Sequence, residues 1–308
     1  MAKLAELRQR IRAVENIQTI TRTLATVAAA QLSRIRRRAA GLGVYAGTMR
    51  EILFRQQDYL ARAGLGFGSV SWLLREREPV TNLALLVITA DRGMCGGYNL
   101  EACRFGMEFW ERSRKAGQKV RFVLKGAKGV GYFKRHHAEI RHQEGWRRGG
   151  IGAADVERLL GVLLNLYRSG EVDAVHAVYT EFQSPIRRRP RAVRLLPVEL
   201  PGGRIEQGAA EAIHKWYYEP AFAEMVDELL AVYLRVQLLD MLLESCASEQ
   251  GARMITMEEA TERADKALQE YRVQHNRLRR EAITIDLLGA VFASRAAAGT
   301  GFTRTGKG

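Results

Sequence analysis

The stretch LAELRQRIRAVENIQTITRTLATVAAAQL, from Leu4 to Leu32, carries the pattern that decides the fold. Steps of three and four residues from Leu4 give eighteen positions up to Ala63, and none is charged, although 27% of the chain is charged. Uncharged positions that repeat every 3.5 residues form the seam of a helix that supercoils with a partner helix. The sequence therefore predicts a long coiled-coil helix at the N-terminus.

The C-terminal part of the chain repeats this pattern. Twenty-one positions at the same spacing run from Phe222 to Phe292, and only Asp240 among them is charged. At about 1.5 Å per residue, a helix of this length spans about 105 Å. Pro220 suits the start of such a helix, where its missing N–H is not needed. Because this segment is longer than the first, we expect its end to extend beyond the first helix.

The seam has an unusual composition, with many small or polar residues such as Thr21, Ala25, Ala28 and Ala264. Small side chains let two helices approach closely but bury little apolar area. We therefore expect closely spaced helices with little apolar area buried between them. Three glycines at positions 41, 43 and 47 favour a bend or fraying in the first helix, because each costs about 1 kcal/mol relative to alanine.

The net charge of +14 raises the possibility of nucleic-acid binding. Its distribution favours a different interpretation. Residues 1–63 hold twelve Lys/Arg against four Asp/Glu, whereas residues 222–292 hold eight against thirteen. Opposite charges at the two ends of the chain suit two segments that lie against one another.

The sequence of the middle part of the chain predicts alternating strands and helices. Strands are expected at residues 83–89, 119–124 and 172–180, and helices at about 100–115 and 154–169. This alternation predicts a small, mostly parallel α/β domain. The expected architecture is an α/β domain inserted in an all-α antiparallel coiled coil. Its segments are a helix in 1–75, the α/β domain in 76–205, a helix in 206–295 and a flexible tail in 296–308.

Other classes of protein are disfavoured by composition. No run approaches the roughly 18 uncharged apolar residues of a membrane span, and the basic N-terminus lacks a signal-peptide core. The three cysteines, Cys95, Cys103 and Cys246, show neither a disulfide framework nor metal-ligand spacing. We expect a cytoplasmic protein with free thiols and without cofactor or metal.

Three sequence blocks resemble the gamma subunit of F-type rotary ATP synthases. The first is IRAVENIQTITR at residues 11–22 with VAAA at 27–30, and the second is ITADRGMCGGYN at residues 88–99. The third is SEQGARMITM at residues 248–257, followed by AT at 260–261, HNR at 275–277 and IT at 283–284. Residues 179–197 also resemble the end of the family's middle domain, so the resemblance covers nearly the whole chain in order.

Several positions depart from the family's pattern. The family has Lys-Ala-Met where this chain has Arg22-Thr23-Leu24, Tyr-Asn at His275-Asn276, Arg-Gln at Arg279-Arg280 and Glu at Asp286. These departures leave two branches open, a housekeeping synthase and a divergent sodium-pumping or hydrolysis-biased enzyme.

The resemblance implies a Rossmann-like middle domain and a non-catalytic subunit. That subunit would be the central rotor shaft, coupling proton or sodium translocation to ATP synthesis or hydrolysis. The implied partners are the alpha and beta subunits of the catalytic head, the epsilon subunit and the membrane c-ring, with no nucleic acid. The implied location is peripheral, on the cytoplasmic face of the bacterial inner membrane. Residues that match the family's contacts between shaft and head are Leu24, Arg253, Arg279, Arg280, Thr284 and Asp286.

The motif turn, with Asp91, Arg92, Gly93, Gly96 and Gly97, lacks the Lys-Ser/Thr of a phosphate loop. We interpret it as a tight turn or close backbone contact rather than a nucleotide site. His136, His137 and His142 are interpreted as a solvated basic loop, and residues 187–191 as a surface loop that could instead contact an acidic partner or lipid headgroups. The alternatives to a shaft are a basic coiled-coil nucleic-acid-associated protein and a nucleotide-binding enzyme.

Overall fold

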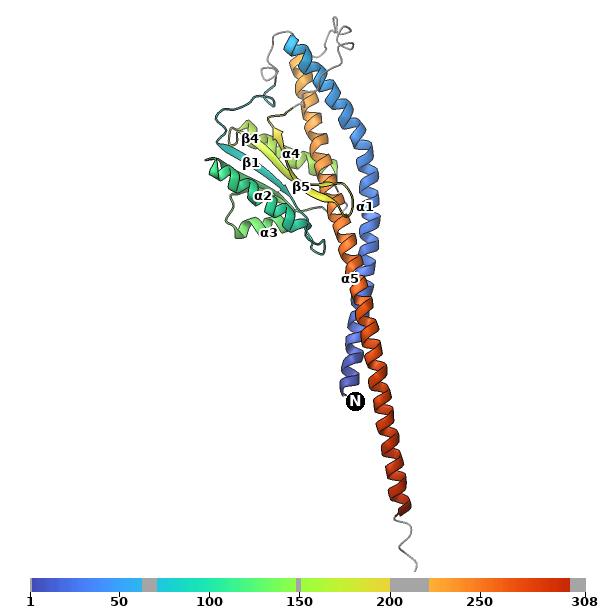
Figure 1. Ribbon diagram of the computed structural model, residues 1–308. Helices are drawn as coiled ribbons and strands as arrows, with labels where there is room; N and C mark the ends of the chain where they lie inside the picture. The colour runs from blue at the N-terminus through green and yellow to red at the C-terminus, as the bar shows by residue number, and fades with distance from the viewer. Residues whose placement is uncertain (1, 63–70, 148–150, 200–221, 300–308) are drawn as a thin grey trace, which may run out of the picture. The chain divides into compact units, whose positions relative to one another are not determined.

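The computed structural model (Figure 1) describes residues 2–62, 71–147, 151–199 and 222–299. The elements along the chain are α1 (Ala2–Arg62), β1 (Asn82–Ile88), α2 (Tyr98–Lys115), β2 (Lys119–Lys125), α3 (Ala127–Arg135), β3 (Ile140–Glu144), α4 (Ala153–Arg168), β4 (Ala174–Phe182), β5 (Arg188–Leu196) and α5 (Phe222–Gly299). Two compact units result. Residues up to Thr26 and from Met257 form the first, and Val27–Thr256 form the second.

The second unit contains one five-stranded sheet with the order β3-β2-β1-β4-β5. The first four strands are mutually parallel, and β5 pairs antiparallel with β4. The expected strands are confirmed as β1, β2 and β4, and the expected helices as α2 and α4. The mostly parallel α/β domain predicted from the alternation is therefore confirmed.

Two edge strands and one short helix were missed by sequence reasoning. Arg188–Arg191 was expected in a loop, but these residues form part of β5. His142 was likewise expected in a loop and lies on β3, whereas His136 and His137 are exposed in the turn after α3, as expected. The physical reason is shared, because both strands lie at a sheet edge and carry polar residues that resemble a loop.

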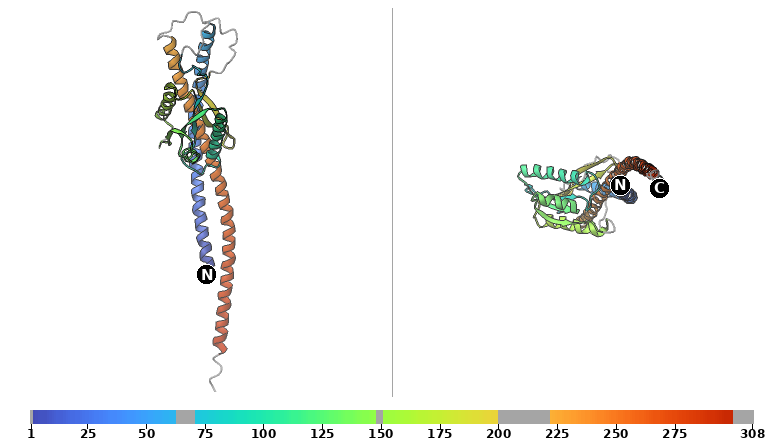
Figure 2. Two further views of the ribbon diagram at one scale, coloured as in Figure 1. Left: turned by 90° about the vertical axis from the view of Figure 1, so that its left-hand side faces the viewer. Right: turned by 90° about the horizontal axis from the view of Figure 1, so that it is seen from below.

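The two faces of the sheet are covered by different helices. Along β1, Leu83, Leu85 and Val87 belong to a core with α2 and α3, and the alternating residues belong to a larger core with α4 and α5. Figures 1 and 2 show α2 and α3 on one side of the sheet and α4 on the other. Because both faces are buried, β1 is apolar from Leu83 to Ile88, as its sequence predicted.

Helix α5 is attached to the sheet by buried hydrogen bonds as well as apolar packing. The backbone N–H of Thr180 donates to Ser245 Oγ at 3.2 Å, and Ser248 Oγ donates to the carbonyl of Thr180 at 3.1 Å. A side chain at Gly251 would meet the backbone of Pro185 at 3.2 Å, so the helix and the β4–β5 turn approach closely. These contacts fix the position of α5 along β4.

The first unit is an antiparallel helix pair (Figure 2, left). The hydroxyl oxygens of Thr21 and Thr261 are 2.7 Å apart across the seam, and Arg8 Nε donates to His275 Nε2 at 3.2 Å. The predicted seam residues Leu7, Ala264 and Leu268 are buried. The antiparallel coiled coil is therefore confirmed here.

Some seam predictions have other outcomes. Ile285 and Phe292 were expected in the seam but are 68% and 66% exposed, because α5 has passed the start of α1 at that point. The three glycines do not interrupt α1, which is continuous from Ala2 to Arg62. Ala63, Pro220 and residues 300–308 lie outside the described residues, as do the side chains of Gln56 and Leu60.

The seam predicts a specific cross-link. Replacing Thr21 and Thr261 with cysteine should give a disulfide on mild oxidation, because these side chains already meet across the seam. Non-reducing electrophoresis and peptide mass spectrometry of the full chain measure its yield. The control is Thr19→Cys with Thr261→Cys, since Thr19 is exposed and donates to the Glu15 carbonyl on its own helix. Equal yields from both pairs would contradict the register.

A half-buried carboxylate on α5, that of Glu244, predicts a pH dependence of stability. Burial raises the pKa of Glu244 to about 7, with the carboxylates of Asp240 and Glu181 adding to the shift, and the Phe182 N–H and Arg191 opposing it. The folded state therefore holds a proton that the unfolded chain releases near its ordinary pKa of about 4.3. This contribution to the free energy of unfolding is complete at low pH and is lost as the pH rises through about 7.

The Glu244→Gln variant tests this contribution. Between about pH 4.3 and 7, its free energy of unfolding in urea should decline less with rising pH than that of the native chain. Above pH 7 the variant should be the more stable of the two. Glu258→Gln, at an exposed position of the same helix, is the control and should keep the native slope. A Glu244→Gln variant with the native slope would refute the assignment.

Candidate functional site

The motif turn after β1 is a tight bend that brings the backbone against α5. Met94 and Gly96 both have positive φ, of 61° and 55°. A Cβ added at Gly96 would lie 2.9 Å from Thr256 Oγ1, so the backbone comes too close to α5 for a larger residue. The predicted tight turn with a close backbone contact is therefore confirmed at Gly96. Gly93 and Gly97 have no positive φ, and a Cβ at Gly93 would meet open space.

Asp91 connects this turn to two other loops. Its Oδ1 accepts a hydrogen bond from the N–H of Ala127 at 2.8 Å, and its Oδ2 accepts one from the N–H of Trp146 at 2.8 Å. Asn99, on α2, accepts from the N–H of Ala90 at 2.8 Å and donates to the Arg92 carbonyl at 3.4 Å. The polar residues of the motif therefore hold the carboxyl end of the sheet together.

Arg253 joins the turn to α5. Its Nη1 pairs with Glu249 Oε1 at 2.7 Å, and its Nη2 donates to the carbonyl of Gly93 at 3.3 Å. Next to it, Ala252 packs with the buried residues Ala90, Cys95 and Tyr98. Burial raises the pKa of the Cys95 thiol, although the nearby Arg253 charge opposes the shift, so the thiol stays neutral at physiological pH. The turn is thus a clamp between the sheet and α5.

The other predicted contact residues lie in the first unit, in two separate places. Leu24 is half-buried on α1, one turn beyond the Thr21–Thr261 contact. Arg279, Arg280, Thr284 and Asp286 are exposed on α5, roughly 30 Å further along the helix at about 1.5 Å per residue. Their hydrogen bonds stay within α5, with Arg280 donating to the Asn276 carbonyl and Thr284 to that of Arg280.

The sequence analysis did not identify as site residues the exposed apolar side chains that lie near Arg279 and Asp286 on α5. They belong to α5, where every residue from Ile283 to Ser294 is exposed. Large apolar residues are normally buried, so their gathering on an exposed helix indicates a binding surface. The signal was present in the sequence as the excess length of α5 over α1. The members of this apolar tip are Ile283, Ile285, Leu287, Leu288, Val291 and Phe292.

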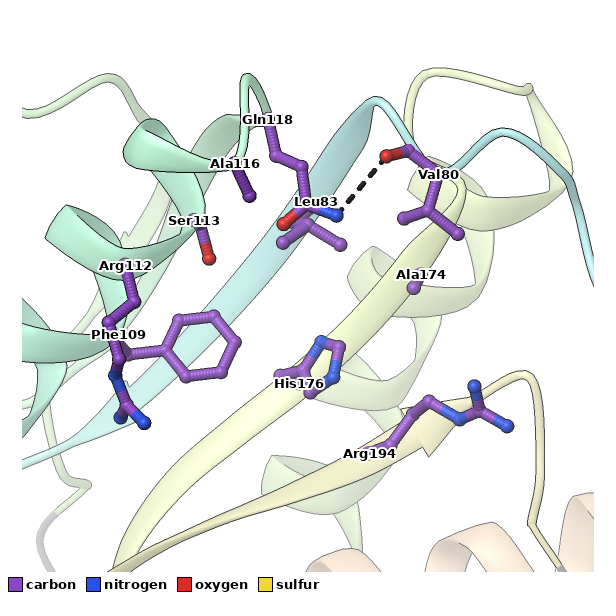
Figure 3. A pocket seen from close by; sticks show the side chains of 10 residues that line it. All are labelled: Val80, Leu83, Phe109, Arg112, Ser113, Ala116, Gln118, Ala174, His176 and Arg194. Carbon is purple, nitrogen blue, oxygen red and sulfur yellow. Dashed lines mark hydrogen bonds between the residues drawn. The ribbon is translucent and has the colours of Figure 1, made fainter.

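A cavity of about 400 Å³ opens between α2 and the strands β4 and β5 (Figure 3). Burial lowers the pKa of His176 to about 4, with Arg194 adding to the shift, so this imidazole is neutral at physiological pH. Its ring lies 5.1 Å from that of Phe109, and Gln118 donates to the Val80 carbonyl at 3.2 Å. None of the described residues that line the cavity is a carboxylate, so among them His176 has no acidic partner for proton transfer.

Within the described part of the chain, no group of three or more His, Cys, Asp or Glu side chains is placed to hold a metal ion. Among the same residues, no helix is long and apolar enough to cross a membrane.

Comparison with known proteins identifies the family. The family model described as ATP synthase matches residues 3–296. The ATP synthase gamma chain of Chlorobaculum tepidum is 32% identical over 292 residues, covering 93% of this chain and 96% of the relative. The gamma chain of Chloroflexus aurantiacus is 33% identical over 301 residues, covering 97% and 99%.

Solved structures share the fold. The central stalk and c-ring structure of the Tetrahymena thermophila mitochondrial ATP synthase matches with a TM-score of 0.58 at 19% identity, covering 78% of this chain and 99% of that chain. The rotor of the Euglena gracilis mitochondrial enzyme matches with a TM-score of 0.61 at 15% identity, covering 92% and 99%. With nearly full-length sequence relatives above 30% identity, the chain belongs to the gamma-chain family of ATP synthases.

Proposed function

We propose that this chain is the central rotor shaft of an F-type ATP synthase and couples ion translocation to ATP synthesis or hydrolysis. The observation that carries the proposal is an antiparallel helix pair, in a gamma-family chain, from which one helix continues alone with an apolar tip. As a gamma chain it is a non-catalytic subunit, so its role is mechanical. The family assignment leaves the nucleic-acid interpretation of the +14 charge without support.

A shaft acts only if it contacts different conformations of the catalytic subunits unequally. A ligand or partner with equal affinity for two states shifts neither. The exposed end of α5 offers such contacts, because its apolar tip follows directly on the charged pair Arg279 and Arg280. The apolar residues would contact apolar surfaces of the surrounding alpha and beta subunits without favouring one rotational position. The guanidinium groups would favour the positions at which they lie next to acidic side chains of those subunits.

The proposed partners follow from this assignment. Alpha and beta subunits would surround the α5 end and Leu24, and the epsilon subunit and c-ring would bind around the α/β domain. Assemblies with a central stalk and c-ring among the structural neighbours support this arrangement. We further propose that the complex sits peripherally on the cytoplasmic face of a bacterial inner membrane. The segments 1–75, 76–205, 206–295 and 296–308 would then be the shaft helix, foot, second shaft helix and tail.

Arg253 has a defined place in this proposal. Its guanidinium is engaged by Glu249 and the Gly93 carbonyl, so its first role would be to hold the motif turn on α5. Contact with the catalytic head would use Arg92, Met94 and the rest of the turn as a surface that Arg253 positions. Met94 is 64% exposed at the apex of that turn.

Charge reversal at the α5 end should weaken coupling. In the assembled complex, Arg279→Glu with Arg280→Glu should leave subunit composition unchanged, because both side chains are exposed and form no ion pair within the described residues. Ion-driven ATP synthesis in membrane vesicles should fall by about thirtyfold, since the two reversed contacts together cost on the order of 2 kcal/mol. ATP hydrolysis by the detached head should fall less.

The control makes the same charge change on α1, away from the proposed partner contacts. Arg36→Glu with Arg37→Glu alters two exposed residues and should keep both activities near the native values. Unchanged ATP synthesis in the Arg279/Arg280 variant would count against the proposed contact. Loss of the chain from the complex would show that these residues serve assembly instead.

A further inference from the structure

A second cavity, of about 520 Å³, lies within the second unit at the carboxyl edge of the sheet. It is lined by the motif turn after β1, the segment after β3, and the facing residues of α1 and α5. Binding pockets for small molecules typically measure about 300–1,000 Å³. The cavity is therefore large enough for an organic phosphate, and Arg253, which holds the motif turn on α5, forms part of its boundary.

Arginines from four separate segments converge on this cavity. Arg34 and Arg38 lie one turn apart on α1, Arg92 comes from the motif turn, Arg147 follows β3, and Arg253 comes from α5. Side chains four residues apart share one face of a helix, which explains why both α1 arginines line the cavity. Because these positions are distant in the sequence, the positive charge gathers only in the folded chain.

The acidic side chains that line the cavity already have partners within the chain. Glu249 pairs with Arg253, and both carboxylate oxygens of Asp91 accept backbone N–H groups. In the described part of the chain, no carboxylate forms an ion pair with the remaining four arginines, although Arg38 donates to the Ile151 carbonyl. With the Arg253–Glu249 pair neutral, four arginines face one aspartate, a surplus of three positive charges.

We propose that this cavity binds a small phosphate-bearing anion, with a pyrophosphate group as the recognised chemistry. Guanidinium groups are planar forks that donate paired hydrogen bonds to phosphate oxygens, and a pyrophosphate can engage several at once. In open α/β sheets, ligands bind in the crevice outside the carboxyl ends of the strands, which is where this cavity lies. The site is distinct from the proposed contacts on the α5 tip, and it shares Arg92 and Arg253 with the proposed contact surface of the motif turn.

Binding would connect α1 to the α/β domain. Arg34 comes from α1 and Arg92 from the loop after β1, so an anion held by both would bridge the two elements. Trp146 lines the same cavity with its indole fixed by a 2.7 Å hydrogen bond to the Thr89 carbonyl. Its fluorescence is therefore expected to respond to the anion, and the Trp146→Phe variant assigns the signal.

Calorimetric titration of the purified full chain tests the proposal. Pyrophosphate should bind with a Kd of about 1 mM or tighter. Arg34→Gln with Arg92→Gln should weaken binding by at least about tenfold, because two charge-assisted contacts are lost. Neither side chain makes a hydrogen bond or ion pair within the described residues, so the fold should survive, as circular dichroism will show. Arg147→Gln provides an independent variant with the same expected direction.

The matched control is Arg36→Gln with Arg37→Gln, which removes two exposed charges of α1 outside the cavity. It should bind pyrophosphate within about twofold of the native chain. Equal loss in both double variants would overturn the proposal, because it would reveal a general counterion effect. Absence of binding by the native chain would also overturn it. The pyrophosphate group could belong to free pyrophosphate or to a nucleotide, and titration with ATP distinguishes these two ligands. Tighter binding of ATP than of pyrophosphate indicates a nucleotide.

Discussion

The packing of α5 against the sheet is the contact on which the rest of the structure depends. Between Val226 and Ala252 this helix is buried or half-buried at almost every position, because it meets both the sheet and α1. The hydrogen bonds of Ser245 and Ser248 to Thr180 set where along the helix the sheet attaches. Beyond Met257 only the seam is buried, and beyond Ala282 every residue with a described side chain is exposed. One helix thus changes from core element to coiled-coil partner to free surface.

This gradient explains both the success and the error of the heptad analysis. A seam with Asp240 as its one charged residue identified α1 and α5, because uncharged positions that repeat every 3.5 residues over such a length are typical of a coiled coil. The same pattern placed Ile285 and Phe292 in a seam that no longer exists there, since a repeat in one helix says nothing about where its partner begins. Among the strands, apolar β1 was evident, whereas β3 and β5 carry the polar residues of edge strands.

The sequence predicted that the motif forms a tight turn, but not which residues its side chains contact. Glycine-rich sequence after a strand indicates a tight turn, and positive φ at Gly96 agrees. The partners of Asp91 lie 36 and 55 residues further along the chain, so no local pattern could reveal them. Arg253 was assigned to a partner contact by resemblance, and its contacts to Glu249 and Gly93 became apparent only in the folded chain. The arginine-lined cavity was hidden for the same reason.

Rotation of the chain inside its catalytic head is the most direct test of the account. A complex of this chain with alpha and beta subunits can be fixed by its head, with a probe attached at Arg104→Cys on the exposed side of α2. Supplied with ATP, the probe should turn continuously in one direction. ATP hydrolysis by complexes that contain the chain, with a probe that fluctuates but never advances, would contradict its assignment as the rotor shaft.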